Sequence, residues 1–474
     1  MKAPRFLGLD GAIGYTILSR AMNMAGSAVT VLLIVRFLSP VEQGYYYTLL
    51  SLISLQMVFE MGFSFVIQQL AAHESAHLEL HAGGSISGNP EAHARLAAAL
   101  QLSLRWYTVA ALAMGAILAP LGVLFFTRHE SVGSAQVAWQ APWLLAVTAL
   151  MALLWCTPFY SFLEGCGQVR AVAALRFAQS LGGSLLAWAA MLAGHGLYAP
   201  SMVILGHVTI GLVFLASRRR LLTGLLRHPA KAGILNWGRE VWPYQWRIAV
   251  SWMCSYFTVQ IFIPILFAVR GAVEAGQMGM SLSIAGYMTI LALAWTSTKA
   301  TPFGRMVARR EFQALDRLFL TTFWQSFAVY TAIAAAVIAA VALLPSLAPH
   351  LAARMLPVGL FALLILGAGA NHVVQSLAIL LRCFKQEPFL IQSLAVASLT
   401  LLLAALTAAR WGDAGTALVY FAVTAGIALP SALLIFARAR RAYLAGGAIT
   451  ASKAVDHGSQ CSEGFLPIRI SEGS

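Results

Sequence analysis

The stretch VEQGYYYTLLS, residues 41–51, returns in the second half of the chain as VEAGQMGMSLS, residues 273–283. Val, Glu and Gly recur in register at the start of both copies, and Leu and Ser recur at their ends. Each copy follows a long apolar segment that closes near an arginine, Arg36 or Arg270, and each runs directly into another apolar segment. Two copies separated by about half the chain, in so apolar a sequence, indicate that one membrane bundle occurs twice.

The composition supports a membrane protein. The 474 residues are 59% hydrophobic and only 10% charged, whereas soluble proteins carry about 25% charged residues. The apolar runs reach the length of about 20 residues that crosses a bilayer, and they do not alternate as barrel strands do. These features exclude an ordinary soluble enzyme and predict an all-α integral membrane protein.

Twelve apolar segments meet this description, six on each side of a basic stretch. We expect an N-terminal six-helix lobe (1–220), a cytoplasmic linker (221–240), a C-terminal six-helix lobe (241–440) and a polar cytoplasmic tail (441–474). The predicted transmembrane helices form two pseudo-symmetric lobes, related as parallel repeats. Their approximate ranges are 12–37, 40–72, 97–126, 141–163, 172–193, 199–217, 241–269, 276–298, 318–344, 357–381, 389–409 and 414–437.

The formal net charge of +14 is explained by topology rather than by nucleic-acid binding. On one side of the predicted membrane, five short loops hold one arginine each, and most other basic residues fall on the opposite side. The positive-inside rule then places both termini and the linker in the cytoplasm. The five cysteines are far apart and show neither metal-binding nor disulfide spacing. No nucleotide-binding or hydrolase motif is present, so we expect no cofactor and no enzymatic activity.

A polar stripe in the first span has a counterpart in the seventh. Each stripe begins with an arginine several residues inside the cytoplasmic end, which is costly unless the arginine meets water, a partner or an anion. Arginine suits a phosphate, which its planar fork can bind with two hydrogen bonds. We therefore predict one substrate cavity with a cationic floor. The stripes, each on one helical face, are Arg20, Asn23, Ser27 and Thr30, and Arg247, Ser251, Cys254 and Thr258.

Two further charged residues are candidates for the cavity. Lys299 either extends the cationic floor or simply flanks the membrane on its basic side. Glu60 is the clearest intramembrane acid and forms a stripe with Gln56 and Ser64. We favour Glu60 as an ion-pair partner of Arg20 over a proton-coupling site, although both uses are open.

Other polar groups carry weaker signals. Asn371 and Gln375 share one helical face and could bond a sugar, but bonds between helices are the commoner use. Tyr45–Tyr47 fit an aromatic belt at the outer membrane interface. Three histidines spaced four apart would share a face if their segment were helical, but they predict no metal site in a solvated stretch. They are His73, His77 and His81.

Several segments together resemble the polysaccharide biosynthesis proteins of the Wzx type, within the multidrug/oligosaccharidyl-lipid/polysaccharide (MOP) flippase superfamily. They span most of the chain up to about residue 440. The segments are Arg36-FLSPVEQGYYYT, Phe59-EMGF, His73-ESAHLEL, Arg105-WY, Leu163-EGCGQV, Val241-WPYQWRIAVSW, Ala275-GQMGMSLS, Thr301-PFGRMVARR and Lys385-QEPFL.

This resemblance implies a flippase of the bacterial inner membrane that moves a polyprenyl-pyrophosphate-linked oligosaccharide for O-antigen, capsule or exopolysaccharide synthesis. It implies a MATE/MOP-like fold with a V-shaped cavity and alternating access, in which Arg20 and Arg247 meet the pyrophosphate. Its implied partners are membrane lipids, a glycan polymerase and a chain-length regulator. The alternatives are a cation-coupled drug exporter and a membrane glycan polymerase or ligase. Drug exporters often carry a carboxylate in the first or seventh helix, and this chain has none there.

Overall fold

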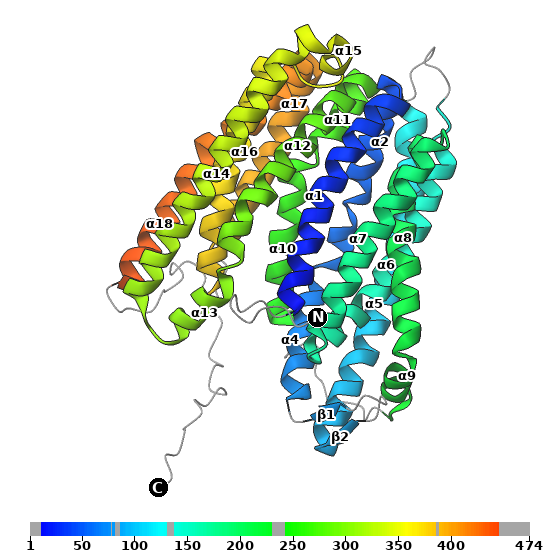
Figure 1. The fold of residues 1–474 in the computed structure, drawn as a ribbon, viewed down its shortest axis with the longest axis vertical. Coiled ribbons are helices and arrows are strands. Elements are labelled where there is room, and N and C mark those ends of the chain that lie inside the picture. The colour runs from blue at the N-terminus through cyan, green and yellow to red at the C-terminus, as the bar shows by residue number, and fades with distance from the viewer. Residues whose placement is uncertain are drawn as a thin grey trace.

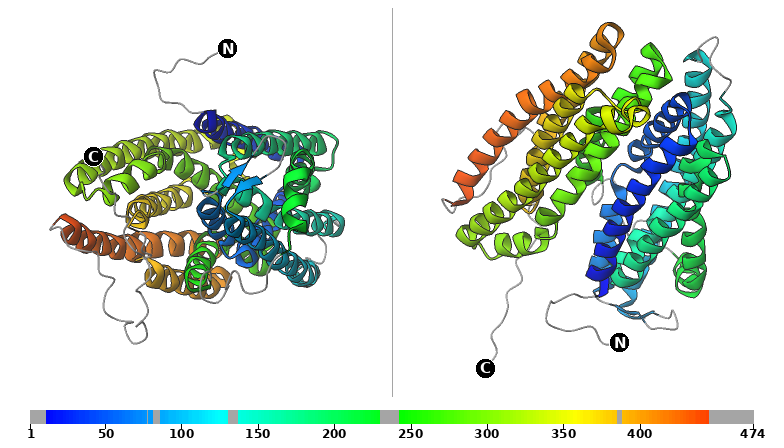
Figure 2. Two further views of the ribbon diagram at one scale, coloured as in Figure 1. Left: turned by 90° about the horizontal axis from the view of Figure 1, so that it is seen from below. Right: turned by 45° about the horizontal axis from the view of Figure 1, so that its top comes forward.

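A computed structural model describes residues 11–76, 78–80, 86–129, 137–229, 242–384 and 388–444. The described chain is almost wholly helical, with one short hairpin (Figure 1). Its helices form two bundles that lie side by side in every view (Figure 2). The predicted all-α fold with two lobes is therefore confirmed.

The first lobe contains α1 to α9, and its helices coincide with the six predicted N-terminal spans. The short strands β1 and β2 pair antiparallel, with Leu78 opposite Gly88. The elements are α1 (Gly11–Phe37), α2 (Pro40–Ile53), α3 (Gln56–Glu60), α4 (Phe63–Ser75), β1 (Leu78–Leu80), β2 (Ile86–Gly88), α5 (Pro90–His129), α6 (Gln140–Gly165), α7 (Val169–Leu192), η2 (Gly196–Tyr198), α8 (Ala199–Ser217) and α9 (Arg219–Arg227).

The second lobe contains α10 to α18 and repeats the layout with different interruptions. The predicted spans 389–409 and 414–437 meet at Gly412, where a φ of 55° turns the chain inside α17. The elements are α10 (Trp242–Val259), α11 (Phe262–Arg270), α12 (Ala272–Ser297), α13 (Ala300–Ala308), α14 (Phe312–Leu347), α15 (Pro349–Ala352), α16 (Val358–Arg382), α17 (Leu390–Val423), the π-helix η4 (Thr424–Ala428) and α18 (Leu429–Leu444).

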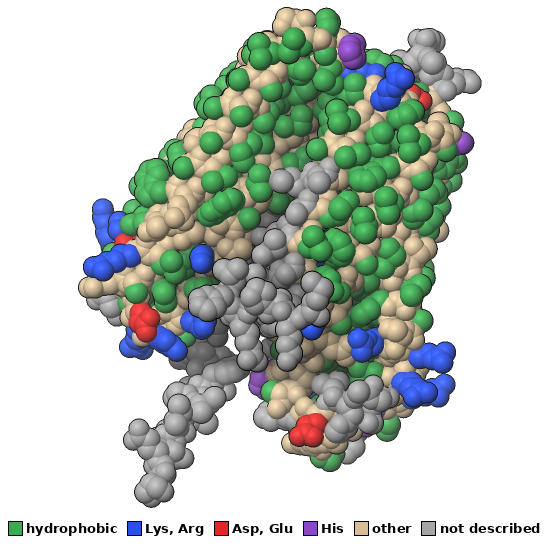
Figure 3. Space-filling model, in the orientation of Figure 1, with side chains coloured by type: hydrophobic (Ala, Val, Ile, Leu, Met, Phe, Trp, Pro, Cys, Tyr) green, Lys and Arg blue, Asp and Glu red, His purple; other side chains and the backbone are tan. Residues whose placement is uncertain are grey.

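The described helices are suited to a bilayer. Seven are long and apolar enough to cross it, and the bent pair formed by α2–α3 and α4 brings the number to eight. Figure 3 shows hydrophobic side chains over the middle of the visible face and basic side chains near its two ends. Because apolar side chains facing outward are stable only in lipid, the chain is a multi-pass membrane protein.

Helix breaks occur inside two of the predicted spans. Met61 and Gly62 both have positive φ, 52° and 64°, and bend the second span by 42° between α3 and α4. The seventh span is interrupted between α10 and α11. Such breaks leave backbone N–H and C=O groups without their helical partners. In membrane proteins these groups are tolerated where other protein groups or water form hydrogen bonds with them.

One expectation from the sequence was wrong. Tyr45–Tyr47 do not form an interfacial belt, because all three side chains are buried inside the protein. Of the three histidines, His73 lies near the end of α4. His77 and His81 lie outside the described residues. No group of three or more His, Cys, Asp or Glu side chains in the described ranges is placed to hold a metal ion.

The two lobes meet through α2 and α12, which carry the two copies of the sequence repeat. We call the end of the molecule where α2 and α12 begin the repeat end. The opposite end, which holds α9 and α13, is called the linker end. In Figure 1 the bundles meet beside α2 and α12 and diverge toward α9 and α13. The repeated residues therefore form the seam between the lobes.

Candidate functional site

Two glycines at equivalent positions of the repeat bring the lobes into backbone contact. A Cβ on Gly44 would lie 1.9 Å from the carbonyl oxygen of Ala272, and a Cβ on Gly276 would lie 2.9 Å from the backbone nitrogen of Gly44. Both distances are shorter than side chains allow, so only glycine fits at this crossing. Small residues that let helix backbones approach are a common basis of packing in membranes.

Hydrogen bonds join the lobes beside these glycines. The Gln43 amide donates to the carbonyl oxygens of Gly276 at 3.0 Å and Arg354 at 2.9 Å. The Arg354 guanidinium donates in return to the Leu38 carbonyl at 2.7 Å and to Gln43 Oε1 at 3.4 Å. Burial lowers the pKa of Arg354, and nearby Glu42 opposes that shift. The guanidinium remains charged, since arginine stays protonated in proteins.

Aromatic side chains complete the seam. Tyr45 stacks on Phe126 of its own lobe and meets Phe267 of the other lobe edge to face, with ring centroids 5.4 and 4.9 Å apart. Tyr47 packs over Gly279, where any Cβ would lie 2.4 Å from the Tyr47 Cβ. This role was not predicted, because three consecutive tyrosines at one end of a span were interpreted as a membrane-interface belt. Their presence inside the repeat was the signal that could have indicated an interlobe contact.

The stripe predicted in the first span lies on a protein-facing side of α1. The side chains of Arg20 and Asn23 lie outside the description. Helical spacing nevertheless puts these positions on the same face as the buried Ile34. Thr30 accepts a hydrogen bond from the Trp188 indole of α7 at 2.9 Å, so this end of the stripe joins two helices within one lobe. Ser27 is half-buried.

The stripe predicted in the seventh span borders a cavity. The side chains of Arg247 and Ser251 are outside the described set. Cys254 and Thr258, on the same helical face, both line a cavity of about 250 Å³ inside the second lobe. Positions 247 and 251 therefore lie on the cavity side of α10, toward the linker end. Thr258 therefore lines this cavity, and the roles of Arg247 and Ser251 remain predictions.

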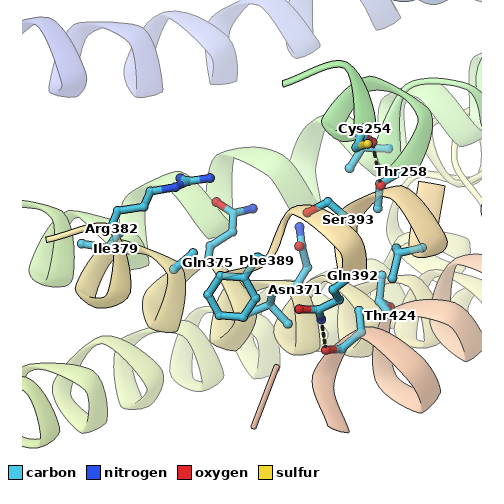
Figure 4. Close-up of a pocket in the computed structure, with 15 residues that line it drawn as sticks. Cys254, Thr258, Asn371, Gln375, Ile379, Arg382, Phe389, Gln392, Ser393 and Thr424 are labelled. Atoms are coloured by element: carbon cyan, nitrogen blue, oxygen red, sulfur yellow. Dashed lines mark hydrogen bonds between the residues drawn. The ribbon is translucent and has the colours of Figure 1, made fainter. Parts of the chain in front are cut away.

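This cavity lies between α10, α16, α17 and η4 (Figure 4). Its lining includes one arginine, and among its described lining residues there is no aspartate or glutamate. The site therefore offers hydrogen-bond donors and acceptors without fixed negative charge. The polar lining residues are Cys254, Thr258, Asn371, Gln375, Arg382, Gln392, Ser393 and Thr424.

Asn371 and Gln375 both line this cavity, and Asn371 also lies against the Tyr420 hydroxyl of α17, in line with the favoured prediction of bonding between helices. The polar ends of Asn371, Gln375 and Ser393 point toward the same space in Figure 4. Gln392 donates to the Ala428 carbonyl at 2.6 Å, while its Oε1 is buried with no partner among the described residues. Sequence reasoning missed Gln392 because α17 offered no polar stripe.

Glu60 and Lys299 lie away from this cavity. Ser64 donates a hydrogen bond of 2.7 Å to Glu60, across the break between α3 and α4. Tyr107 of α5 is close enough to interact with the Glu60 charge. The predicted pair of Glu60 with Arg20 depends on a side chain outside the description. Lys299 is exposed at the start of α13 and does not line the cavity.

Two other buried acids have structural partners. Glu74 accepts a 2.7 Å bond from Arg95 within the first lobe. In the second lobe Asp316 accepts two 2.7 Å bonds from Arg440 and one of 3.1 Å from the Tyr443 hydroxyl. Charges that are paired and hydrogen-bonded in this way are tolerated in low-dielectric surroundings. The burial of Glu74 and Asp316 is therefore explained by ion pairs that stabilise the fold.

Neither a protein family nor a curated protein sequence matches the chain. Solved structures do match its fold. An inward-facing multidrug resistance MATE family transporter of the MOP superfamily superposes with a TM-score of 0.62 at 12% identity, covering 91% of this chain and 98% of its own. An outward-facing one gives 0.55 at 13% identity, covering 94% and 100%.

The lipid II flippase MurJ, in an inward closed conformation, also shares the fold. Its TM-score is 0.56 at 12% identity, with 91% of this chain and 90% of MurJ covered. At such identities the likeness concerns the fold. This chain therefore has the two-lobed helical fold of MATE transporters and of this lipid II flippase.

Proposed function

We propose that the protein is a flippase that moves a polyprenyl-pyrophosphate-linked oligosaccharide across the bacterial inner membrane by alternating access. The observation that carries this proposal is the chemistry of the cavity in the second lobe. Its described lining combines Arg382 with amides and hydroxyls and has no carboxylate, and Arg247 occupies the same face of α10. A site of this kind suits a glycan joined to an anionic phosphate.

The arrangement of the lobes supports an inward-facing state. The described interlobe hydrogen bonds of Gln43 and Arg354 lie at the repeat end. By the positive-inside rule, the linker end, with Arg219–Arg227, is cytoplasmic, and we place both termini on that side of the membrane. Substrate would then enter between the lobes from the cytoplasm and leave after the seam opens. Arg20 and Arg247, with Asn23, Ser27, Ser251 and Thr258, would meet the lipid head.

Cation-coupled drug export is the second candidate. The solved structures that share the fold include drug transporters as well as a lipid flippase. The observation that favours export is Glu60, an acid held by Ser64 at a helix break inside the first lobe. An organic cation or a proton would find its negative group there. Glycan polymerisation has no comparable observation in its favour.

The test is surface glycan in a strain that lacks the chromosomal copy. We expect the double variant Arg20→Ala/Arg247→Ala to lower surface glycan roughly 100-fold at equal protein level, because each charge-assisted contact contributes roughly 1.5–3 kcal/mol. Arg309→Ala is the control, since Arg309 is exposed at the linker end. Normal glycan in the double variant would contradict the flippase. Drug efflux that depends on Glu60 but not on the arginines would favour export.

A further inference from the structure

We propose that the cavity of the second lobe binds one neutral sugar unit of the carried glycan and so determines which glycans are accepted. This inference rests on the proposed flippase function and extends it to specificity. The pyrophosphate meets the arginines, while a hydroxyl-rich ring enters the space between α10, α16, α17 and η4.

The cavity has the size of a single ring. Its volume of about 250 Å³ falls just below the range of roughly 300–1,000 Å³ that holds drug-sized ligands. An entire oligosaccharide would not fit, so the rest of the glycan must remain in the space between the lobes. The cavity therefore binds one part of the substrate rather than the whole glycan.

The side chains that line the cavity suit sugar hydroxyls. Asn371 and Gln375, one turn apart on α16, each present two N–H donors and an acceptor oxygen. Gln375 forms no hydrogen bond within the described part of the chain, and Asn371 lies against the Tyr420 hydroxyl. Ser393 adds a hydroxyl from α17. A mixture of donors and acceptors without a carboxylate matches neutral hydroxyl groups better than a cation.

The backbone around the cavity is also built for polar binding. The π-helix η4 interrupts regular helical bonding at Thr424–Ala428, and such π-turns occur often at functional sites. The Ala428 carbonyl accepts the Gln392 amide at 2.6 Å, which leaves Gln392 Oε1 buried without a partner among the described residues. Because buried polar atoms are normally satisfied, this oxygen is a position for a ligand hydroxyl.

Interhelical bonding is the ordinary explanation for amides inside a membrane protein. The described structure provides such a use for Gln392, through Ala428, and for Asn371, through the Tyr420 hydroxyl of α17, but it shows none for Gln375 among the described residues. Gln375 faces the cavity without a helix partner in the described part of the chain, so we assign its amide to the ligand.

The test uses purified protein and two synthetic probes, a short-chain prenyl pyrophosphate and the same pyrophosphate carrying one N-acetylglucosamine. We expect the sugar-bearing probe to bind wild type roughly tenfold more tightly than the bare one. In Asn371→Leu/Gln375→Met this advantage is lost, while the bare probe binds as before. Gln313→Met is the control, because Gln313 is an exposed glutamine of the same lobe.

A second measurement tests directly whether a sugar occupies the cavity. In a background without the five native cysteines, Ser393→Cys is treated with a thiol reagent, and free N-acetylglucosamine should slow its modification. Equal affinity for both probes together with no protection would overturn the sugar site and leave the flippase standing. Protection by free sugar without binding of either pyrophosphate probe would support the sugar site and contradict the flippase. Failure of all three ligands would contradict both.

Discussion

Residues 41–51 and 273–283 are two copies of one sequence that lie against each other, yet they make different contacts. Gly44 and Gly276 contact each other. Near a twofold axis, side chains at equivalent positions would occupy the same space, so glycine is expected at both positions. Around them the copies diverge. Gln43 joins the lobes by hydrogen bonds, whereas the equivalent Ala275 carries no polar side chain.

The aromatic positions diverge in a complementary way. Tyr47 of the first copy packs over Gly279, its equivalent in the second copy. A large residue at both positions would collide, and a small residue at both would leave a void. The repeat therefore supplies two matching helices, while departures from the repeat let them fit together. The alternating access proposed above would require this seam to be stable and yet able to separate.

The largest expected effect comes from the position that both copies share. Gly44→Ala puts a methyl group 1.9 Å from a backbone oxygen, so we expect the α2–α12 seam to separate. Overpacking of this kind costs roughly 1–3 kcal/mol or more. Spin labels at Gly224→Cys on α9 and Gly304→Cys on α13, both in open space, should then show a shorter distance between the linker ends.

The control for this substitution is Gly286→Ala on α12, where a Cβ would meet no atom within 4 Å. This control should leave the label distances unchanged and stabilise the helix slightly. Unchanged distances in Gly44→Ala would mean that the seam does not depend on glycine packing.

A smaller effect is expected where the copies differ. Gln43→Leu removes the bonds to the carbonyls of Gly276 and Arg354. Because a hydrogen bond between membrane helices contributes roughly 0.6 kcal/mol on average, we expect a loss of about 1 kcal/mol, seen as a lower Tm in detergent. Ser281→Ala is a useful companion, since it removes only bonds within the second lobe, the one from the Leu356 N–H and the one to the Gln277 carbonyl. A Tm equal to that of wild type for Gln43→Leu would show that Gln43 adds nothing to the seam.

The smallest effect is expected at the helix starts. α2 begins with a capping box in which Ser39 and Glu42 bond each other's backbone N–H groups, while α12 has Gly271 as its N-cap and so has no side-chain cap. Ser39→Ala should lower stability by about 1 kcal/mol or less, and Ser39→Gly, which imitates the second copy, by only a few tenths. Comparing the Tm values of the two variants tests this order. A larger loss for Ser39→Gly would indicate that Ser39 has a role beyond capping.

Much of the fold could be predicted from the sequence. The spans predicted from apolar length coincide with helices, and the repeat at 41–51 and 273–283 does lie at the junction of equivalent elements. Of the residues predicted to bind substrate, Thr258 lines a cavity, and its role there stays a prediction. Asn371 and Gln375 line the same cavity, and Asn371 also lies against the Tyr420 hydroxyl of α17, in line with the favoured use between helices. Gln392 was missed, because a single amide in an apolar helix has no pattern.

The amino-acid sequence is sufficient to predict that the chain is helical, that it spans a membrane and that it consists of two related halves. These properties follow from the length of apolar runs and from repetition, which are local or periodic along the chain. Only the tertiary structure decided that Tyr45–Tyr47 are buried in the seam and that Thr258, Gln375 and Gln392 surround one cavity. Thr258 is distant in the chain from both glutamines, and the three side chains meet only because α10 and α16 pack against α17.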